Sequence, residues 1–184
     1  LTEREDVELV RDTARFVDDR TVRAGGREFD ADYVVVATGS TVNVPDLPGL
    51  DGVDYHTSAD LLDSTELPDS AVVMGFGYVG IEMVPYLVEA GGTDVTVVEH
   101  DDRPLDAPDP AFGDALLDLY RAEFDVTVPT NCHEQRVEST ADGGVRLHVE
   151  SDDGTADAFE GDRLYLFTGR RPAIDRLGLA NTSV

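Results

Sequence analysis

The chain has 184 residues, of which 39 are acidic and 14 basic, so its formal net charge is -25. This length fits one domain, or one domain with pieces of another. The sequence offers no basic stripe for nucleic acid, it would be repelled by an anionic membrane surface, and no apolar run reaches the roughly 18 residues of a membrane span.

The first part of the chain carries short strand patterns separated by turn signals. Strands are predicted at residues 13–17 and 21–23, and the continuous apolar run of residues 33–36 predicts a buried strand. A linker comes next, marked by two prolines and a glycine: Pro45, Pro48 and Gly49. Residues 1–45 are therefore predicted to be a segment separate from the rest of the chain.

From residue 71 the pattern alternates between apolar strands and amphipathic helices. Strands are predicted at 71–74, 94–98 and 124–128, and helices at 78–89 and 111–121, with Pro85 expected to kink the first helix. This β-α-β-α-β order predicts an α/β fold with a Rossmann-like, doubly wound parallel sheet.

The last part of the chain returns to strands. Residues 136–139, 145–149 and 163–167 predict an antiparallel meander on the same domain, and residues 169–184 have a loop-like pattern. Three segments are therefore predicted, 1–45, 46–168 and 169–184. The last is expected to end inside a larger protein, because it closes without a strand or helix.

Gly75-Phe76-Gly77-Tyr78-Val79-Gly80 matches a dinucleotide-binding loop. It follows an apolar strand and opens a helix, which is the context that gives this weak motif its meaning. Gly75 permits the tight turn, Gly77 lets the backbone approach a pyrophosphate, and Gly80 lets helix and strand pack closely. The alternative is a glycine-rich turn that binds nothing.

Glu99 ends the next predicted strand, 19 residues after Gly80. An acid about 20 residues past the loop accepts hydrogen bonds from the adenosine ribose and would repel a 2′-phosphate, so NAD(H) is predicted over NADP(H). His100 and Arg103 follow Glu99 and would soften that preference.

No other chemistry stands out. The single Cys132 cannot form an internal disulfide, which fits a reducing cytoplasm, and it has no second cysteine for redox exchange. His133 is a sequence neighbour of Cys132, and the four histidines show no metal-ligand spacing, so no metal site and no catalytic residue are predicted. A cytoplasmic location is expected, since the N-terminus lacks the features of a signal peptide.

Every basic residue is Arg, and acidic residues occur along the whole chain. One interpretation is an acidic surface for a basic partner. The other is adaptation to molar salt, which screens the self-repulsion of so many carboxylates. Depletion of Lys with excess Asp resembles proteins of halophilic archaea, and the second interpretation predicts that stability rises with salt.

Nearly the whole chain resembles the FAD-dependent pyridine nucleotide-disulfide oxidoreductases, the family of dihydrolipoamide dehydrogenase, glutathione reductase and mercuric reductase. The resemblance rests on segments in a fixed order: residues 35–40, Pro45, Pro48-Gly49, Thr57-Ser58, Leu67-Pro68, Gly75 to Glu82, residues 95–99 and residues 169–172. It implies that residues 46–168 form the NAD(H) domain and that the flanking segments are strips of an adjacent FAD domain.

The resemblance implies roles for single residues. Gly75 to Glu82, including Ile81, would form the nucleotide loop and first helical turn, with Tyr78 over the flavin and Glu82 near flavin and nicotinamide. Cys132 would place its backbone near the adenine, and Gly169 would contact the nicotinamide end. The family pairs the acid at Glu82 with a lysine, and this chain has no lysine.

The sequence also departs from the family. It lacks the FAD loop, the redox cysteine pair, the Gly-Asp flavin motif and the dimerisation domain, and Ala173 stands where Asn is common. The chain is therefore expected to be an inactive fragment of a homodimeric, dihydrolipoamide dehydrogenase-like parent that binds FAD elsewhere. The alternatives are an NADH oxidase or ferredoxin reductase type of flavoenzyme, and a non-catalytic NAD-sensing module.

Overall fold

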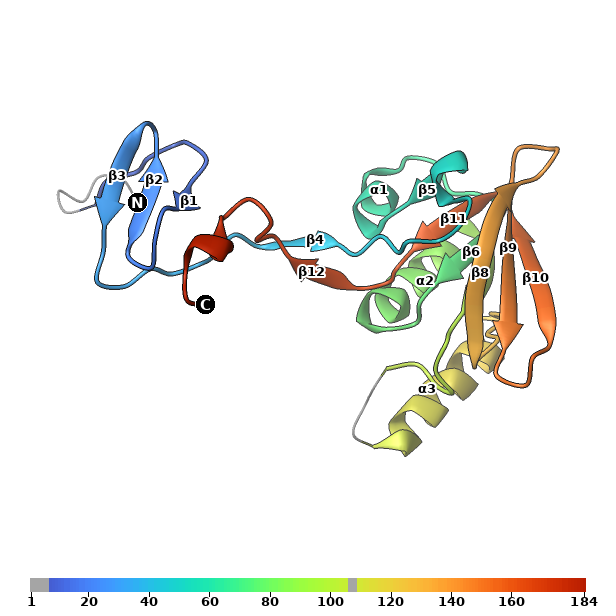
Figure 1. The fold of residues 1–184 in the computed structure, drawn as a ribbon. Helices are drawn as coiled ribbons and strands as arrows, with labels where there is room; N and C mark the ends of the chain where they lie inside the picture. The colour runs from blue at the N-terminus through green and yellow to red at the C-terminus, as the bar shows by residue number, and fades with distance from the viewer. Residues whose placement is uncertain (1–6, 106–108) are drawn as a thin grey trace. The chain divides into compact units, whose positions relative to one another are not determined.

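The computed structural model describes residues 7–105 and 109–184 (Figure 1). The chain divides into two compact units. The central unit is the continuous stretch of residues 42–169, and the discontinuous unit combines residues 1–41 with residues 170–184. No helix in the described part of the chain is both long and apolar enough to cross a bilayer.

The central unit is built on a four-stranded parallel sheet with the order β5-β11-β6-β7 (Figure 1). Its strands are β5 (Tyr55–His56), β6 (Ser70–Met74), β7 (Asp94–Val98) and β11 (Arg163–Leu166). Three helices accompany it: α1 (Ser58–Asp63), α2 (Tyr78–Gly91) and α3 (Pro110–Glu123). The predicted mixed α/β class is confirmed.

One face of the parallel sheet is packed against the helices. Val73 and Val97 on the sheet share a buried core with Val84 and Leu87 of α2 and Leu117 of α3. Alternate strand residues point to opposite faces, so the run of valines in β6 and β7 fills two cores at once. α2 continues through Pro85 to Gly91 and is capped by Gly92, whose φ of 65° is the left-handed conformation that glycine adopts readily.

The other face of the sheet is covered by an antiparallel meander. Its strands are β8 (Cys132–Ser139), β9 (Val145–Ser151) and β10 (Ala156–Gly161), in the order β10-β9-β8. Leu147 of β9 shares a second buried core with Val72 and Leu164 of the parallel sheet. The predicted meander is therefore present, with β10 as its third strand in place of β11.

The discontinuous unit holds a small antiparallel sheet of β1 (Arg15–Phe16), β2 (Thr21–Ala24) and β3 (Arg27–Asp30). Within it the C-terminal segment docks on β1, because the Phe16 N–H donates to the Leu177 carbonyl at 2.7 Å and Asn181 donates to the Phe16 carbonyl at 3.0 Å. A two-stranded ladder pairs β4 (Ser40–Val42) with β12 (Arg170–Pro172).

The prediction of a buried strand at residues 33–36 is wrong. These residues form no strand, and Tyr33 and Val35 are 92% and 87% exposed. Within the described residues this segment has no neighbouring strand to pair with, so its apolar side chains meet no core.

Other differences are smaller. The predicted strand 124–128 is reduced to a single parallel bridge between Thr96 and Thr127. Residues 169–184 were predicted to be loop-like, but they contain β12 and a 3-10 turn at Leu179–Asn181. The pattern also gave no sign of β3, β4, β5, β10 or α1, which are short or, in β10, poor in large apolar residues.

Candidate functional site

The Gly75–Gly80 loop motif comprises the turn between β6 and α2 and the first three residues of α2, and two of its glycines are required by packing. Gly75 has φ of 92°, and a Cβ there would lie 2.8 Å from the Phe167 carbonyl oxygen. A Cβ on Gly80 would lie 2.5 Å from the Gly75 carbonyl oxygen. Such distances are too short for a side-chain carbon, so these two positions keep the strand, loop and helix in close contact.

Gly77 lies in a different environment. It precedes the first turn of α2, and a Cβ there would meet nothing within 4 Å. No side chain caps the helix, so N–H groups of the first turn remain free of side-chain partners. Free N–H groups and the helix dipole favour an anion at this end of a 14-residue helix, and the open space at Gly77 leaves room for one.

Phe76 anchors the loop through its side chain. The ring is fully buried and meets Tyr120 of α3 edge to face, with centroids 4.8 Å apart. The Tyr120 hydroxyl donates to the Ile81 carbonyl, and burial raises the pKa of Tyr120 to about 12. Tyr120 of α3 therefore contacts both the loop at Phe76 and the first turn of α2 at Ile81, and Phe76 offers only its backbone to a ligand.

Glu99 is one of two buried polar side chains in the described chain, and it binds the loop directly. One carboxylate oxygen accepts the Phe76 N–H at 2.7 Å, and the other accepts the Asp101 N–H at 3.0 Å. Each oxygen keeps further acceptor capacity for a hydroxyl group. The acid predicted from spacing thus lies beside the loop, and it also fixes the loop's shape.

Cys132 begins β8 next to Glu99, since its N–H donates to the Glu99 carbonyl at 3.1 Å. The thiol is buried, and its sulfur lies 3.3 Å from both the Thr130 carbonyl and the Ser151 hydroxyl. The Cys132 side chain therefore packs in the interior, and its backbone N–H links the start of β8 to Glu99.

The remaining predicted site residues divide by exposure. Tyr78 is 79% exposed and Glu82 is exposed, while Val79 and Ile81 pack partly against the helical core. Gly169 follows β11, has φ of 86°, and accepts the Asn43 N–H at 3.0 Å. The loop, Glu99 and Gly169 all follow the carboxyl ends of parallel strands, which is where open α/β sheets bind ligands.

The structure adds neighbours that sequence reasoning did not combine. His100 and His133 present nearly parallel rings, 16° apart in plane, with centroids 6.5 Å apart. Burial raises the pKa of Glu134, which lies close enough to His100, Glu99 and His133 to feel their charges. These residues are distant in sequence, and backbone hydrogen bonds between residues 99–101 and residues 129–132 bring them together.

Glu99, His100 and Asp101 each place a potential ligand atom within 4.8 Å of the others. Both oxygens of Glu99 already accept backbone N–H groups. This group therefore has two free side chains on exposed residues, and it does not make a metal centre.

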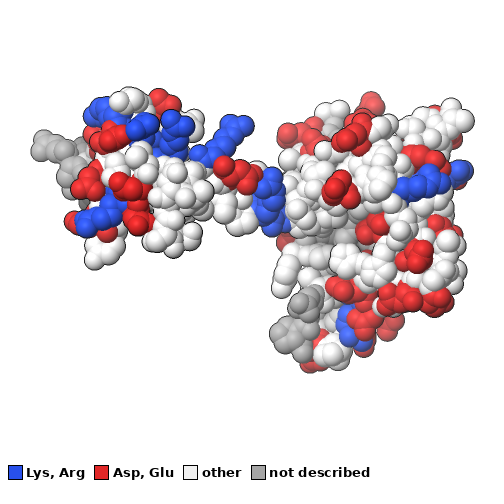
Figure 2. Space-filling model, viewed as in Figure 1, with Lys and Arg blue, Asp and Glu red and all other residues white. Residues whose placement is uncertain are grey.

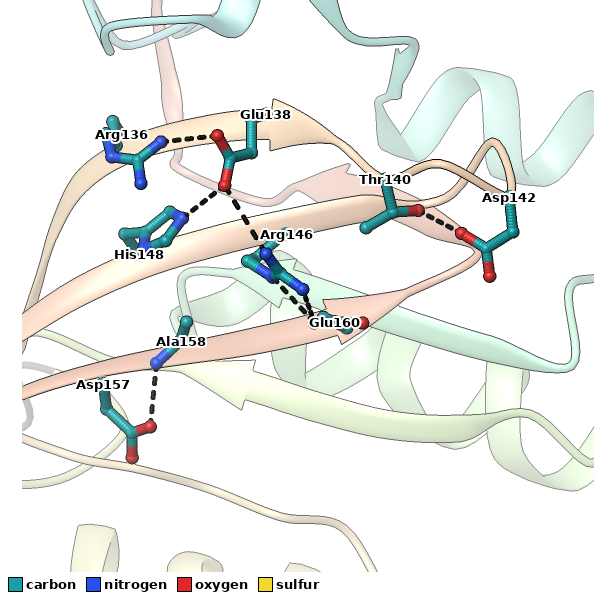
Figure 3. A network of polar contacts seen from close by, with 9 residues as sticks. All are labelled: Arg136, Glu138, Thr140, Asp142, Arg146, His148, Asp157, Ala158 and Glu160. Carbon is teal, nitrogen blue, oxygen red and sulfur yellow. Dashed lines mark hydrogen bonds and ion pairs between the residues drawn. The ribbon is translucent and has the colours of Figure 1, made fainter.

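A separate polar network lies on the outer face of the meander (Figure 3). Glu138 accepts from His148 at 2.8 Å and from Arg136 at 2.7 Å, and these hydrogen bonds lower its pKa to about 2. Arg146 joins Glu138 to Glu160 of the neighbouring strand. The network connects the three strands of the meander.

Charge is distributed unevenly between the two units. The central unit has 28 acidic residues against 5 arginines, a net charge of -23, whereas the discontinuous unit has 11 against 9, a net charge of -2. Figure 2 shows acidic side chains over the visible face of the central unit. The five arginines all bind carboxylates or carbonyls of the same unit: Arg103, Arg121, Arg136, Arg146 and Arg163. An anion at the loop would therefore be held by backbone N–H groups.

Comparison with protein families matches residues 1–183 to the pyridine nucleotide-disulphide oxidoreductase model. The chain is 34% identical over 173 residues to a mercuric reductase of Bacillus cereus, covering 94% of this chain and 27% of that protein. It is 31% identical over 190 residues to a dihydrolipoyl dehydrogenase of Haloferax volcanii, covering 97% and 38% respectively.

A solved structure is also similar, that of the HOCl-induced flavoprotein disulfide reductase RclA from Escherichia coli. The TM-score is 0.75 at 25% identity, and the match covers 94% of this chain and 38% of RclA. The chain therefore spans about a third of the length of these relatives.

Proposed function

The chain belongs to the pyridine nucleotide-disulphide oxidoreductase family, and from that premise we propose that its central unit binds NAD(H) for hydride exchange with a flavin in the whole protein. The observation that carries the proposal is the pairing of the Gly75–Gly80 loop with Glu99. The loop leaves open space at Gly77 before an uncapped helix, and Glu99 lies beside it with acceptor capacity to spare.

The residues fit a dinucleotide. Backbone N–H groups at the start of α2 would hold the pyrophosphate, and Glu99 would accept hydrogen bonds from the adenosine ribose. A 2′-phosphate beside Glu99 would meet its carboxylate and the nearby Glu134, and the five arginines of the central unit already bind carboxylates or carbonyls in the described structure. These features support a preference for NAD(H) over NADP(H).

At the nicotinamide end, Tyr78, Glu82 and Gly169 would lie close to the bound nucleotide. Tyr78 is exposed at the start of α2, so its ring is free to cover or uncover a neighbouring surface. Glu82 lies one helical turn later on the same helix. When bound, the nicotinamide supplies hydride chemistry. The residues of this chain would orient the nicotinamide and disfavour NADP(H), which carries the 2′-phosphate.

The discontinuous unit supports the assignment of FAD-domain segments. We propose that residues 1–45 and 169–184 are strips of the flavin domain and that residues 46–168 are the NAD(H) domain. The exposed apolar run of residues 33–36 supports this, because a neighbouring strand of a flavin domain would cover it. The parent would then be a homodimeric flavoprotein in which FAD and the redox cysteines belong to other segments.

We propose dihydrolipoamide as the substrate of the whole protein, since Glu99 supports NAD(H) and a dihydrolipoyl dehydrogenase is among the relatives. Mercuric ion is the competing substrate, because several relatives are mercuric reductases. Turnover assays of the parent protein with dihydrolipoamide and with mercuric ion would distinguish the two.

Calorimetric titration of the chain with NADH, NADPH and FAD in molar KCl tests the proposal. We expect NADH to bind, NADPH to bind more weakly and FAD to bind little. Stoichiometric FAD binding would overturn the domain assignment, and equal affinities for NADH and NADPH would overturn the role of Glu99.

A further inference from the structure

We propose that Tyr120 is a positioning residue for the nucleotide site, because its hydroxyl takes the place of the backbone N–H that Pro85 removes from α2. This role rests on the proposed function, since it gives α3 a part in holding the loop that would receive the pyrophosphate. Tyr120 would shape the loop and would make no contact with the nucleotide itself.

Pro85 leaves one carbonyl of α2 without its usual helical partner. In an α-helix each interior carbonyl accepts the N–H of the residue four positions later. The residue four positions after Ile81 is Pro85, which has no N–H. An interior proline therefore usually kinks or breaks a helix, yet α2 continues to Gly91. Another donor is needed at the Ile81 carbonyl.

Tyr120 supplies that donor from α3, since its hydroxyl donates to the Ile81 carbonyl. Burial raises the pKa of Tyr120 to about 12, so the hydroxyl keeps its proton at neutral pH. The residue is 3% exposed, and its own carbonyl accepts the N–H groups of Phe124 and Val126 at the end of α3. The donor is therefore held in place by the surrounding structure.

The same side chain restrains the loop on both sides of Gly77. After Gly77, the Ile81 N–H donates to the Gly77 carbonyl at 3.0 Å, while the Ile81 carbonyl accepts the Tyr120 hydroxyl. Before Gly77, the Phe76 ring meets the Tyr120 ring edge to face, with centroids 4.8 Å apart. Gly77 is the position with open space for a pyrophosphate. A loop already held in its binding shape loses less entropy when the ligand binds.

Tyr165 of β11 provides a natural comparison. It belongs to the same buried core as Tyr120 and is fully buried, but its hydroxyl has no hydrogen-bond partner among the described residues. Loss of the Tyr165 hydroxyl would therefore leave no acceptor unpaired, whereas loss of the Tyr120 hydroxyl would leave the Ile81 carbonyl without its donor. The two tyrosines form a matched pair for substitution by phenylalanine.

The test is a double-mutant cycle on the whole chain in molar KCl. The variants are Tyr120→Phe, Pro85→Ala and their combination, with Tyr165→Phe as the matched control. Each variant is titrated with NADH by calorimetry well below its melting temperature, and each is unfolded with urea. Pro85→Ala restores a backbone N–H four residues after Ile81, so the cycle shows whether the hydroxyl and the N–H replace each other.

We expect Tyr120→Phe to weaken NADH binding by about two- to tenfold, the net contribution of one hydrogen bond. In the Pro85→Ala background the same substitution should change the affinity by less than about twofold, because the restored N–H holds the Ile81 carbonyl. The urea midpoint should follow the same pattern. Tyr165→Phe should leave the NADH affinity unchanged and should not lower the urea midpoint.

Unchanged NADH affinity in folded Tyr120→Phe, even with a lower urea midpoint, would make Tyr120 a structural residue only and overturn the positioning role. Equal losses with proline and with alanine at position 85 would show that the hydroxyl does not replace the missing N–H. An equal loss in Tyr165→Phe would assign the effect to the core in general. An unmodified chain that binds no NADH would reject the proposed function, and the positioning role with it.

Discussion

The two units of this chain differ most in how they bury apolar side chains. In the described residues, Phe16 and Ala24 are the only buried apolar side chains of the discontinuous unit, while the central unit has two buried cores. The discontinuous unit also exposes four consecutive apolar residues, 33–36. Its strands thus need a further surface to pack against, whereas the central unit supplies its own.

The units also differ in charge, with a net charge of -2 in the discontinuous unit and -23 in the central unit. Strong like charge destabilises a compact state, so the unit with the better core also carries the larger electrostatic penalty. The same unit is proposed to bind an anionic nucleotide. Packing and backbone N–H groups, rather than side-chain cations, must therefore support that site.

Hydrogen exchange should separate the units most strongly. We expect amides of β6, β7 and β11 to exchange orders of magnitude more slowly than those of β1, β2 and β3, because the central strands are buried on both faces. Mass spectrometry of exchanged peptides from the whole chain measures this. Similar protection in both units would contradict the difference in burial between them.

Adjacent leucines of α1 test the core of the central unit. Leu61 is fully buried and Leu62 is 63% exposed. Leu61→Ala should lower the free energy of unfolding by about 2–5 kcal/mol, and Leu62→Ala should change it by about 0.5 kcal/mol or less. Urea denaturation in high salt compares the two, and equal losses would contradict the burial pattern.

Two glycines of the loop separate packing from binding. Gly80→Ala would place a carbon 2.5 Å from the Gly75 carbonyl and should cost about 1–3 kcal/mol of stability. Gly77→Ala meets open space, so it should leave the melting temperature nearly unchanged yet weaken NADH binding. Calorimetry and thermal melts of both variants measure this. Full NADH affinity in folded Gly77→Ala would argue against a pyrophosphate there.

Salt should act mainly on the central unit. Screening reduces repulsion among its carboxylates, so we expect its melting temperature to rise from dilute buffer into molar KCl. Exchange protection of β1, β2 and β3 should change much less over the same range. A melting temperature that is flat or falls with added KCl would contradict the electrostatic account.

Two glutamates of β8 should give the smallest effects, with opposite signs. Burial raises the pKa of Glu134, so it opposes folding increasingly as pH rises above 4.5, and Glu134→Gln should be more stable at neutral pH. Glu138 has its pKa lowered from 4.5 to about 2 by His148 and Arg136. The ionised Glu138 stabilises the fold above pH 4.5, and this stabilisation is lost as the pH falls towards 2. The Glu138→Gln variant should therefore be less stable than the unmodified chain at neutral pH and equally stable near pH 2.

Denaturation of both variants at several pH values checks these signs. The Glu138 side chain is 41% exposed, so added salt should weaken its effect. A loss of stability in Glu134→Gln at neutral pH would mean that its carboxylate makes a favourable contact.

The sequence predicted best where a local pattern determines structure. Continuous valines mark β6 and β7, and helical spacing marks α2 and α3, because these elements bury their own side chains. The run of residues 33–36 has the same apolar pattern but pairs with no strand in the described parts of the chain, and the pattern alone cannot show that. β10 was missed because Ala156–Gly161 offers mainly small and acidic residues on a partly exposed edge.

In the candidate site too, local sequence patterns predict some contacts and miss others. The spacing of Gly75, Gly80 and Glu99 was sufficient to predict that they lie together, because one β-α-β unit contains them all. Pairing of His100 with His133 depends on how the meander crosses the sheet. The 32 residues between them carry no pattern that sets this distance.

The most direct test of the nucleotide site is a titration of the isotopically labelled chain with NADH, followed by amide NMR in molar KCl. We predict saturable shifts at Gly77, Tyr78, Glu99 and residues 131–133, with little change in β1, β2 and β3. Absence of shifts at the loop, or shifts centred on the discontinuous unit, would contradict the claim that the central unit holds the nucleotide.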